Sequence, residues 1–274
     1  MAADTIEAVM RRDKLIVATS LSLLALIAWG YVLRLIGMMD MGGMAMPGMR
    51  MSSNPSEVAM FSSLQPWNIA EATFAFIMWA VMMVGMMTPA AAPTILIYAR
   101  VHRQASLDDS PLAATGYFAG GYFLAWIGFS LGATLGQWLL ERSTLLDVTM
   151  RVTDHVFGGV VLIAAGLFQL SPVKDACLRQ CQSPLLYIQR HGGFNQGRAG
   201  SLKLGFDLGL YCVGCCWALM ALLFVSGIMN ILWIAGIAVF VLAEKLMPKL
   251  GILSRLAGAV LIAAGIALII RPLL

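Results

Sequence analysis

The sequence predicts an all-α protein, a polytopic bundle of about seven transmembrane helices. Of its 274 residues, 60% are hydrophobic and only 12% are charged, whereas soluble domains carry about 25% charged residues. The hydrophobic residues also fall in segments of the length that a helix needs to cross a bilayer, about 20 residues. Lipid is therefore the expected surrounding. The net charge of +4 is divided among the connecting segments and indicates no nucleic acid partner.

Seven segments are apolar enough to be membrane helices. They are residues 15–36, 69–97, 113–140, 156–170, 206–228, 231–246 and 253–270. The fourth is short and the sixth follows the fifth almost without a loop, so six helices is the alternative, and the fifth and sixth could form a tight hairpin. We expect two parts: residues 1–68, with the first helix and a methionine-rich outer loop, and residues 69–274, with a metal-binding helix bundle.

Basic residues gather in alternate connecting segments. Lysine and arginine in short loops mark the cytoplasmic side of a membrane protein. One basic group precedes the first helix at residues 11–14, and others follow the second, fourth and sixth helices. This bias predicts a cytoplasmic N-terminus and a C-terminus on the opposite side. It places Cys177 and Cys181 in a cytoplasmic loop, and Cys212 near the cytoplasmic end of its helix.

Three cysteines stand close together in the stretch Tyr211-Cys-Val-Gly-Cys-Cys-Trp217. Positions three and four apart share a helix face, so Cys212 is expected to face both Cys215 and Cys216. Met220 extends the same side. A single buried cysteine commonly just packs, but a cluster predicts metal or redox chemistry. Thiolate and thioether are ligands that select Cu(I), and thiolate also suits zinc.

A second pair, Cys177 and Cys181, lies in a short stretch between Pro172 and Pro184. A spacing of four puts both sulfurs on one face of one or two helical turns. This pair can bind a metal alone or complete a site with the Cys212 group. Structural zinc motifs use two CxxC knuckles, whereas the spacings here are CxxxC and CxxCC, so copper is expected in preference to zinc.

Methionines line about half of the circumference of the second helix. They are Met78, Met82, Met83, Met86 and Met87. Taken alone, such a stripe commonly serves packing, because methionine fills irregular gaps. Pro89 and Pro93 indicate a kinked helix whose freed carbonyls need partners. The stripe lies between an outer methionine loop and an inner thiol cluster, which makes it a candidate for metal binding as well as packing.

The predicted outer loop is also rich in methionine. Residues 38–51 hold seven of the 19 methionines, namely Met38, Met39, Met41, Met44, Met46, Met49 and Met51. Glycine and proline between them predict a flexible loop rather than a core stripe. Thioethers bind Cu(I) and form no disulfides, so they suit an oxidising compartment. Compositional drift and contact with lipid headgroups are the alternatives.

Ionisable residues inside predicted membrane helices are functional candidates by default. Glu244 lies near the inner end of the sixth helix, where it is expected to pair with its neighbour Lys245. Asp207 precedes Cys212 by about one turn. Glu71 opens the second helix, where an acid suits the helix N-terminus.

Several of these stretches together resemble a bacterial family of unknown function whose members are labelled predicted metal-binding integral membrane proteins, sometimes copper chaperones. The stretches are Met78-Trp-Ala-Val-Met-Met-Val-Gly-Met-Met-Thr-Pro89, Ser171 to Pro184, Cys212-Val-Gly-Cys-Cys-Trp-Ala-Leu-Met220, Gly227-Ile-Met-Asn230 and Glu244-Lys245. The resemblance spans about residues 71–248 and implies metal binding, without a tested reaction. The methionine loop lies outside it.

The favoured function is therefore Cu(I) handling in a bacterial inner membrane, either by passage across the membrane or by delivery to a copper-dependent membrane enzyme or chaperone. Assembly as a homo-oligomer is left open. The chain has no phosphate-binding glycine motif, no HExxH and no nucleophile elbow, which excludes an ATP-driven pump for this chain alone and supports a non-enzymatic role. A membrane thiol–disulfide oxidoreductase and a non-catalytic accessory subunit are the alternatives.

Overall fold

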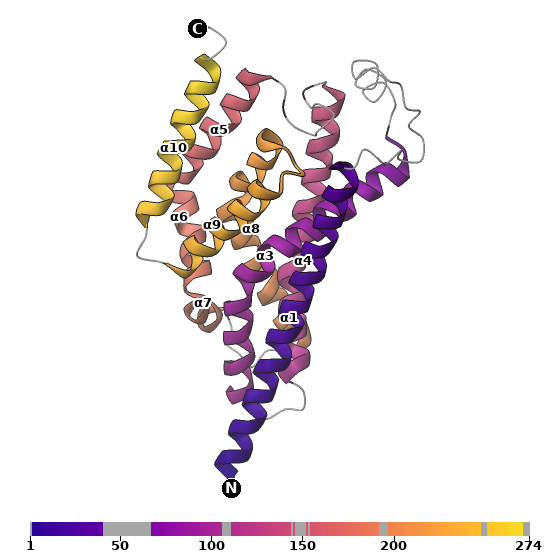
Figure 1. Ribbon diagram of the computed structural model, residues 1–274. Coiled ribbons are helices and arrows are strands. Elements are labelled where there is room, and N and C mark those ends of the chain that lie inside the picture. Colours follow the sequence, from indigo (N-terminus) through magenta and orange to yellow (C-terminus); the bar gives the residue numbers. More distant parts are fainter. Residues whose placement is uncertain are drawn as a thin grey trace.

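The computed structural model describes residues 2–40, 67–105, 111–143, 145, 152, 154–191, 197–247 and 251–270. These residues form nine helices and no β-strand (Figure 1), which confirms the predicted all-α class. The helices are α1 (Ala2–Asp40), α3 (Ile69–Ala105), α4 (Pro111–Arg142), α5 (His155–Gln169), α6 (Pro172–Gln182), α7 (Pro184–Arg190), α8 (Arg198–Ser226), α9 (Ile231–Leu246) and α10 (Gly251–Ile270).

Each of the seven predicted segments is helical, but the number of full membrane spans is smaller. Among the described residues, α1, α3, α4, α8 and α10 are long and apolar enough to cross a bilayer, and α5 and α6 together make a sixth candidate with a 60° bend. The remaining predicted segment, the sixth in chain order, is α9, which has 16 residues. At 1.5 Å per residue it is about 24 Å long, less than a hydrocarbon core of about 30 Å.

Helix α8 is the centre of the bundle, in contact with α4, α5, α6 and α9. Its backbone touches that of α4. A Cβ on Gly205 would lie 1.9 Å from the carbonyl oxygen of Phe118, and one on Gly121 would lie 2.0 Å from that of Leu202. Small residues at membrane helix interfaces permit such close approach. The glycines therefore fix α4 directly against the cysteine-bearing helix.

A second glycine-lined interface joins α5 to α10. A Cβ on Gly159 would lie 2.8 Å from the carbonyl oxygen of Gly265, and one on Gly166 would lie 2.7 Å from that of Gly258. The two glycines of each helix are two turns apart and so share one face. The α5–α10 pair forms one side of the bundle, seen at the left in Figure 1.

Helix α3 runs antiparallel to α8. Its upper contact is the ring of Trp79 on Phe224, with centroids 5.2 Å apart. Its lower contact is a 2.9 Å hydrogen bond from the Tyr98 hydroxyl to the Ser201 hydroxyl. Pro89 lies between them inside the helix, and in Figure 1 the upper part of α3 runs obliquely and its lower part upright. This agrees with the predicted kink.

Helices α8 and α9 form the tight hairpin that the short connection predicted. Gly227 has a φ of 99°, a left-handed conformation that glycine adopts without steric cost. The Asn230 side chain then accepts hydrogen bonds from the backbone nitrogens of Leu232 and Trp233, at 3.1 and 3.4 Å, which is the usual role of an N-cap asparagine. The hairpin brings the end of α9 back beside the middle of α8.

The first and last helices begin and end at opposite ends of the molecule (Figure 1). An arrangement with the N-terminus inside and the C-terminus outside requires this separation. Which end faces the cytoplasm remains a prediction from the basic residues.

Candidate metal centre

Three thiols meet at the interface between α6 and α8. The sulfurs of Cys181, Cys212 and Cys215 all lie within 4.8 Å of one another. Cys181 is 8% exposed, Cys212 is fully buried and Cys215 is 2% exposed. All three are free thiols. We call them the thiol triad; it has the donor type and closeness that a soft metal ion needs.

The bend between α5 and α6 brings Cys181 into the triad. Ser171 ends the bend and caps α6, because its hydroxyl accepts a 3.2 Å hydrogen bond from the backbone nitrogen of Lys174. Pro172 follows at the first turn, where its missing N–H costs nothing. Cys177 and Cys181 were expected in a connecting segment with one or two helical turns, and both stand on an 11-residue helix that packs against α8.

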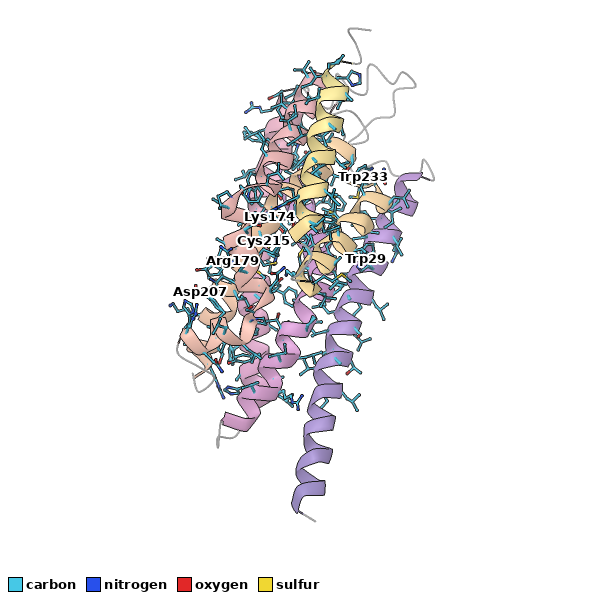
Figure 2. All side chains as sticks on the ribbon, turned by 90° about the vertical axis from the view of Figure 1, so that its left-hand side faces the viewer. Trp29, Lys174, Arg179, Asp207, Cys215 and Trp233 are labelled. Atoms are coloured by element: carbon cyan, nitrogen blue, oxygen red, sulfur yellow. The ribbon has the colours of Figure 1, made fainter. Side chains whose placement is uncertain are left out.

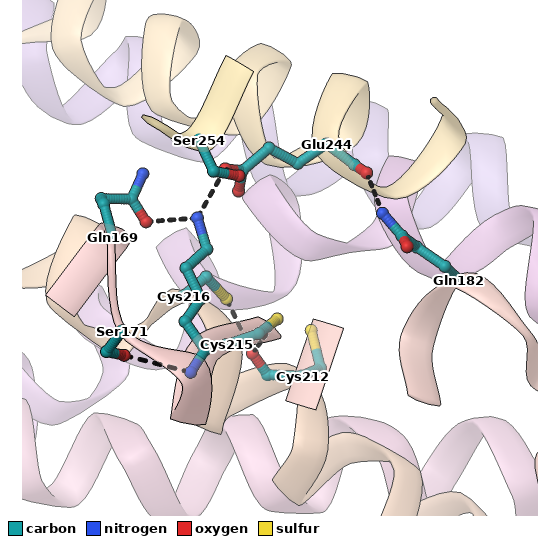
Figure 3. Close-up of polar contacts among 9 residues, drawn as sticks. Gln169, Ser171, Gln182, Cys212, Cys215, Cys216, Glu244 and Ser254 are labelled. Atoms are coloured by element: carbon teal, nitrogen blue, oxygen red, sulfur yellow. Dashed lines mark hydrogen bonds and ion pairs between the residues drawn. The ribbon is translucent and has the colours of Figure 1, made fainter. Parts of the chain in front are cut away.

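The other two cysteines border the triad without joining it. The Cys216 thiol donates to the carbonyl oxygen of Cys212 at 2.8 Å, and Figure 3 shows its sulfur apart from those of Cys212 and Cys215. The Cys177 sulfur lies against α8, where a Cβ on Gly214 would be 3.2 Å away. The structure thus gathers three of the five predicted cysteine ligands and places two beside them.

Two donors converge on the sulfur of Cys212. The Tyr122 hydroxyl donates to it at 2.9 Å, and the Lys245 ammonium donates to it at 2.9 Å. Lys245 also donates to the Tyr122 hydroxyl at 3.2 Å. Charge-assisted hydrogen bonds of this kind favour a thiolate. Sequence reasoning missed Tyr122 entirely and gave Lys245 another role; a lysine inside an apolar segment was the available signal.

The expected pairing of Glu244 with Lys245 was wrong. Consecutive residues on a helix point about 100° apart, so these two side chains leave α9 in different directions. The Glu244 carboxylate accepts from the Lys174 ammonium at 2.5 Å and from the Ser254 hydroxyl at 2.5 Å. Lys174 also donates to the side-chain oxygen of Gln169. Figure 3 shows this group, which joins α5, α6, α9 and α10.

We call Gln169, Lys174, Glu244 and Ser254 the carboxylate cluster. Lys174 is fully buried and Glu244 is 4% exposed. The Gln182 amide supports the cluster by donating to the backbone carbonyl of Glu244 at 2.8 Å. Glu244 and Ser254 also line part of a pocket of about 210 Å³.

The thiol triad lies at the middle of α8. That helix begins at Arg198 and ends at Ser226, and Figure 2 shows Cys215 at about mid-height of the molecule. The prediction placed Cys212 near an end of its helix, because hydropathy alone began the helix at Phe206. The preceding residues, including Lys203, are also helical, and they move the cysteines to the centre.

The methionines of α3 are buried beside this centre. The five are at most 2% exposed and Met220 is fully buried. Met82, Met83, Met86 and Met87 lie on α3 between Trp79 and Tyr98, and Cys212 and Cys215 lie on α8 between Ser201 and Phe224. The stripe and these cysteines therefore lie between the same two α3–α8 contacts. All six methionines belong to the core, and a metal role for them remains a prediction.

The methionine-rich segment is mostly outside the described residues. Helix α1 continues to Asp40, so Met38 and Met39 belong to a helix rather than to the predicted loop. Met41, Met44, Met46, Met49 and Met51 lie outside the described part of the chain, and their role remains a prediction.

A hydrogen-bonded chain leads from the upper end of α4 to the methionine stripe. Glu141 accepts from the Trp67 indole at 2.7 Å and from the Gln137 amide at 2.8 Å. Gln137 accepts in turn from the indole of Trp79 at 2.8 Å. Trp79 directly follows Met78 on α3. Sequence reasoning did not single out these residues, because their partners are far apart in the chain.

Helix α7 closes the lower side of the centre. The Tyr187 ring meets Tyr211, the neighbour of Cys212, with centroids 5.4 Å apart. Burial raises the pKa of the Tyr187 phenol to about 12, with a smaller contribution from the charge of Asp207. The phenol therefore stays neutral at physiological pH and acts as part of the wall. Asp207 itself pairs with Lys203 at 3.7 Å and is separate from the thiols.

Comparison with protein families gave one match. The family model PpoB2, described as a copper chaperone, matches residues 76–268, which is well over half of the chain. The match includes the whole of the thiol triad, the carboxylate cluster and the methionine stripe. No curated protein and no solved structure matched the chain.

Proposed function

Because the chain belongs to the PpoB2 copper chaperone family, we propose that it binds Cu(I) at the thiol triad inside the membrane. From there it would move copper across the membrane or hand it to a copper-dependent membrane enzyme or chaperone. The observation that carries this proposal is the meeting of Cys181, Cys212 and Cys215 within 4.8 Å. Soft thiolate ligands select Cu(I) among the metals available to a cell.

The number of gathered thiols favours copper over zinc. Structural zinc sites are almost always four-coordinate and tetrahedral. The structure brings three sulfurs within 4.8 Å of one another, and the sulfur of Cys216 is not one of them. Two or three sulfur ligands suit Cu(I), whereas zinc would lack a fourth protein ligand.

The side chains between the upper end of α4 and the thiol triad would suit a path that leads a soft cation from the outer side to the triad. Glu141 would attract cations at the upper end, and the methionines below it would offer neutral thioethers. The methionines of the stripe and the triad cysteines belong to one buried core, so an ion on the stripe would reach the thiols without leaving it. Thiolates bind Cu(I) more tightly than thioethers do, so affinity would rise toward the triad. This gradient favours import or retention over export.

Burial argues against the thiol–disulfide alternative. An oxidoreductase needs an accessible cysteine with a thiolate character, and its substrate must reach the sulfur. The triad cysteines are at most 8% exposed, which leaves space for an ion and none for a protein disulfide. The remaining alternative is an accessory subunit in which these residues only pack.

Copper content tests the proposal. Purified protein, loaded with Cu(I) without oxygen, is expected to bind copper, and the variant with Cys181, Cys212 and Cys215 changed to serine is expected to lose it. The matched control is Cys177→Ser with Cys216→Ser, which changes two bordering thiols and should keep most of the copper. Acidification should weaken binding, because the ligands are thiolates. A triple variant that retains the wild-type copper content would contradict the proposal.

A further inference from the structure

One full positive charge stands at the thiol triad. The Lys245 ammonium is 2.9 Å from the sulfur of Cys212, 3.2 Å from the Tyr122 hydroxyl and 5.6 Å from the centre of the Tyr122 ring. Each contact holds the charge beside the sulfur. The hairpin at Gly227 folds α9 back along α8 and so supplies this lysine to the middle of the bundle.

This charge is not neutralised by a carboxylate. Within the described part of the chain, the two ion pairs are Lys174 with Glu244 and Lys203 with Asp207, and neither includes Lys245. Glu244 is the next residue on α9, but its carboxylate is committed to Lys174 and Ser254. The only anion that the contacts offer Lys245 is therefore a cysteine thiolate.

From this geometry we propose that Lys245 makes the triad selective for a monovalent soft cation; the inference rests on the proposed function. An uncompensated charge inside a membrane protein is costly. The Lys245 ammonium lies 2.9 Å from a sulfur of the triad, so it repels any cation bound there. By Coulomb's law it repels a divalent ion about twice as strongly as a monovalent ion at the same place.

The disadvantage of a divalent ion does not depend on how many of the three sulfurs bind it. For any one set of sulfur ligands, the ammonium raises the energy of a divalent ion by about twice as much as that of a monovalent ion. Lys245 thus determines which ion fits, while the cysteines supply the bonds. Because the ammonium hydrogen-bonds to a ligand sulfur, it is a specificity-determining residue rather than a ligand.

Ag(I) and Cd(II) separate ionic charge from softness, because both prefer sulfur and they differ in charge. The experiment measures the affinity of the purified full-length protein for each ion by competition titration. For Lys245→Met, we expect the ratio of Ag(I) to Cd(II) affinity to fall by about tenfold or more, the size seen when one partner of a buried charge pair is removed. Lys245→Arg keeps the charge and should keep most of the ratio.

Two further variants test whether the change in the affinity ratio comes from the charge of Lys245, from the loss of a hydrogen bond to Cys212, or from the loss of any lysine. Tyr122→Phe removes one donor to Cys212 but no charge, so it should weaken both ions alike and leave the ratio unchanged. Lys203→Met removes an exposed lysine on the same side of the bundle and should change neither affinity. If Lys245→Met does not fold, Lys245→Gln gives the same comparison with a polar side chain, and the thermal unfolding of the metal-free protein checks each variant.

The outcomes separate this inference from the proposed function. If the wild type takes up neither Ag(I) nor Cu(I), the proposed function fails and the inference fails with it. If the wild type binds Ag(I) at the triad and the uncharged Lys245 variants keep the wild-type ratio, the inference alone is wrong.

Discussion

Two lysines reach the interior of this bundle and end on different partners. Lys174, from α6, is bound by the carboxylate of Glu244 and the amide of Gln169. Lys245, from α9, is bound by the thiol of Cys212 and the phenol of Tyr122. The first lysine forms an ion pair with a carboxylate. The second is held by a sulfur and a phenol, with no carboxylate among its described contacts.

We therefore expect Lys174 to stabilise the fold and Lys245 to act on the proposed metal site. The carboxylate cluster ties α5, α6, α9 and α10 together through an ion pair and its hydrogen bonds. The group around Lys245 contains a sulfur that would bind the metal ion under the proposed function. Adjacent residues of α9, Glu244 and Lys245, supply one charge to each group, so the same helix serves both.

The largest expected effect is on the carboxylate cluster. Lys174→Met would leave the carboxylate of Glu244 buried without its counter-ion, which costs about 3–5 kcal/mol of stability. Lys245→Met should cost less than about 2 kcal/mol, because the thiol of Cys212 can remain protonated and neutral. Chemical unfolding in detergent measures both. Equal losses of stability would show that the two lysines contribute equally to the fold.

A double variant tests whether the loss in Lys174→Met comes from the unpaired carboxylate of Glu244. Adding Glu244→Gln to Lys174→Met removes the unpaired charge and keeps an amide that can bond to Ser254. The double variant should regain about 1–3 kcal/mol relative to Lys174→Met, since paired charges removed together cost less than one removed alone. The same unfolding measurement gives the result. A double variant less stable than Lys174→Met would mean that Glu244 is held by other groups.

The third prediction concerns the helix contact that positions Tyr122. A methyl group on Gly205 would meet the carbonyl oxygen of Phe118 at 1.9 Å, so Gly205→Ala must push α4 away from α8, at a cost of about 1–3 kcal/mol. The copper affinity should fall as well, because Tyr122 moves with α4. The control is Gly120→Ala, since a Cβ there meets nothing within 4 Å. If both variants are equally stable, the close contact is not what holds α4 in place.

The sequence predicted the class, the helical segments and the chemical nature of the site. Hydropathy located seven of the nine described helices, and cysteine spacing identified Cys212 and Cys215 as members of one candidate site. These features are local, because they depend on residues within a turn or two of one another. The hairpin between α8 and α9 was predictable for the same reason.

The partners of the site were not predictable, because they come from helices distant in the chain. Tyr122 meets Cys212 only through the glycine contact between α4 and α8. Lys245 reaches the same sulfur only because the hairpin returns α9 to the middle of α8. Lys174, read as a loop residue, is buried because α5 bends into α6. Adjacency in the sequence did not predict the partners of Glu244 and Lys245, because consecutive side chains on a helix point about 100° apart.

Counted per residue, the smallest expected effect on stability is at the methionine stripe. This variant tests whether the methionines take part in metal movement. Replacing Met82, Met83, Met86 and Met87 with leucine approximately conserves volume and should cost less than about 1.5 kcal/mol per site. Leucine keeps the apolar packing but removes the sulfur, so Cu(I) should still saturate the thiol triad at equilibrium while reaching it more slowly.

The measurement is the rate at which Cu(I), added outside sealed vesicles, loads the triad. The matched control replaces Met60, Met150 and Met229 with leucine, which changes methionines outside the stripe and should leave the rate unchanged. Slower loading in the stripe variant alone would identify these sulfurs as transient binding sites on the path. A wild-type rate would mean that the stripe only packs, and copper would then have to reach the triad from the side of α6 and α7.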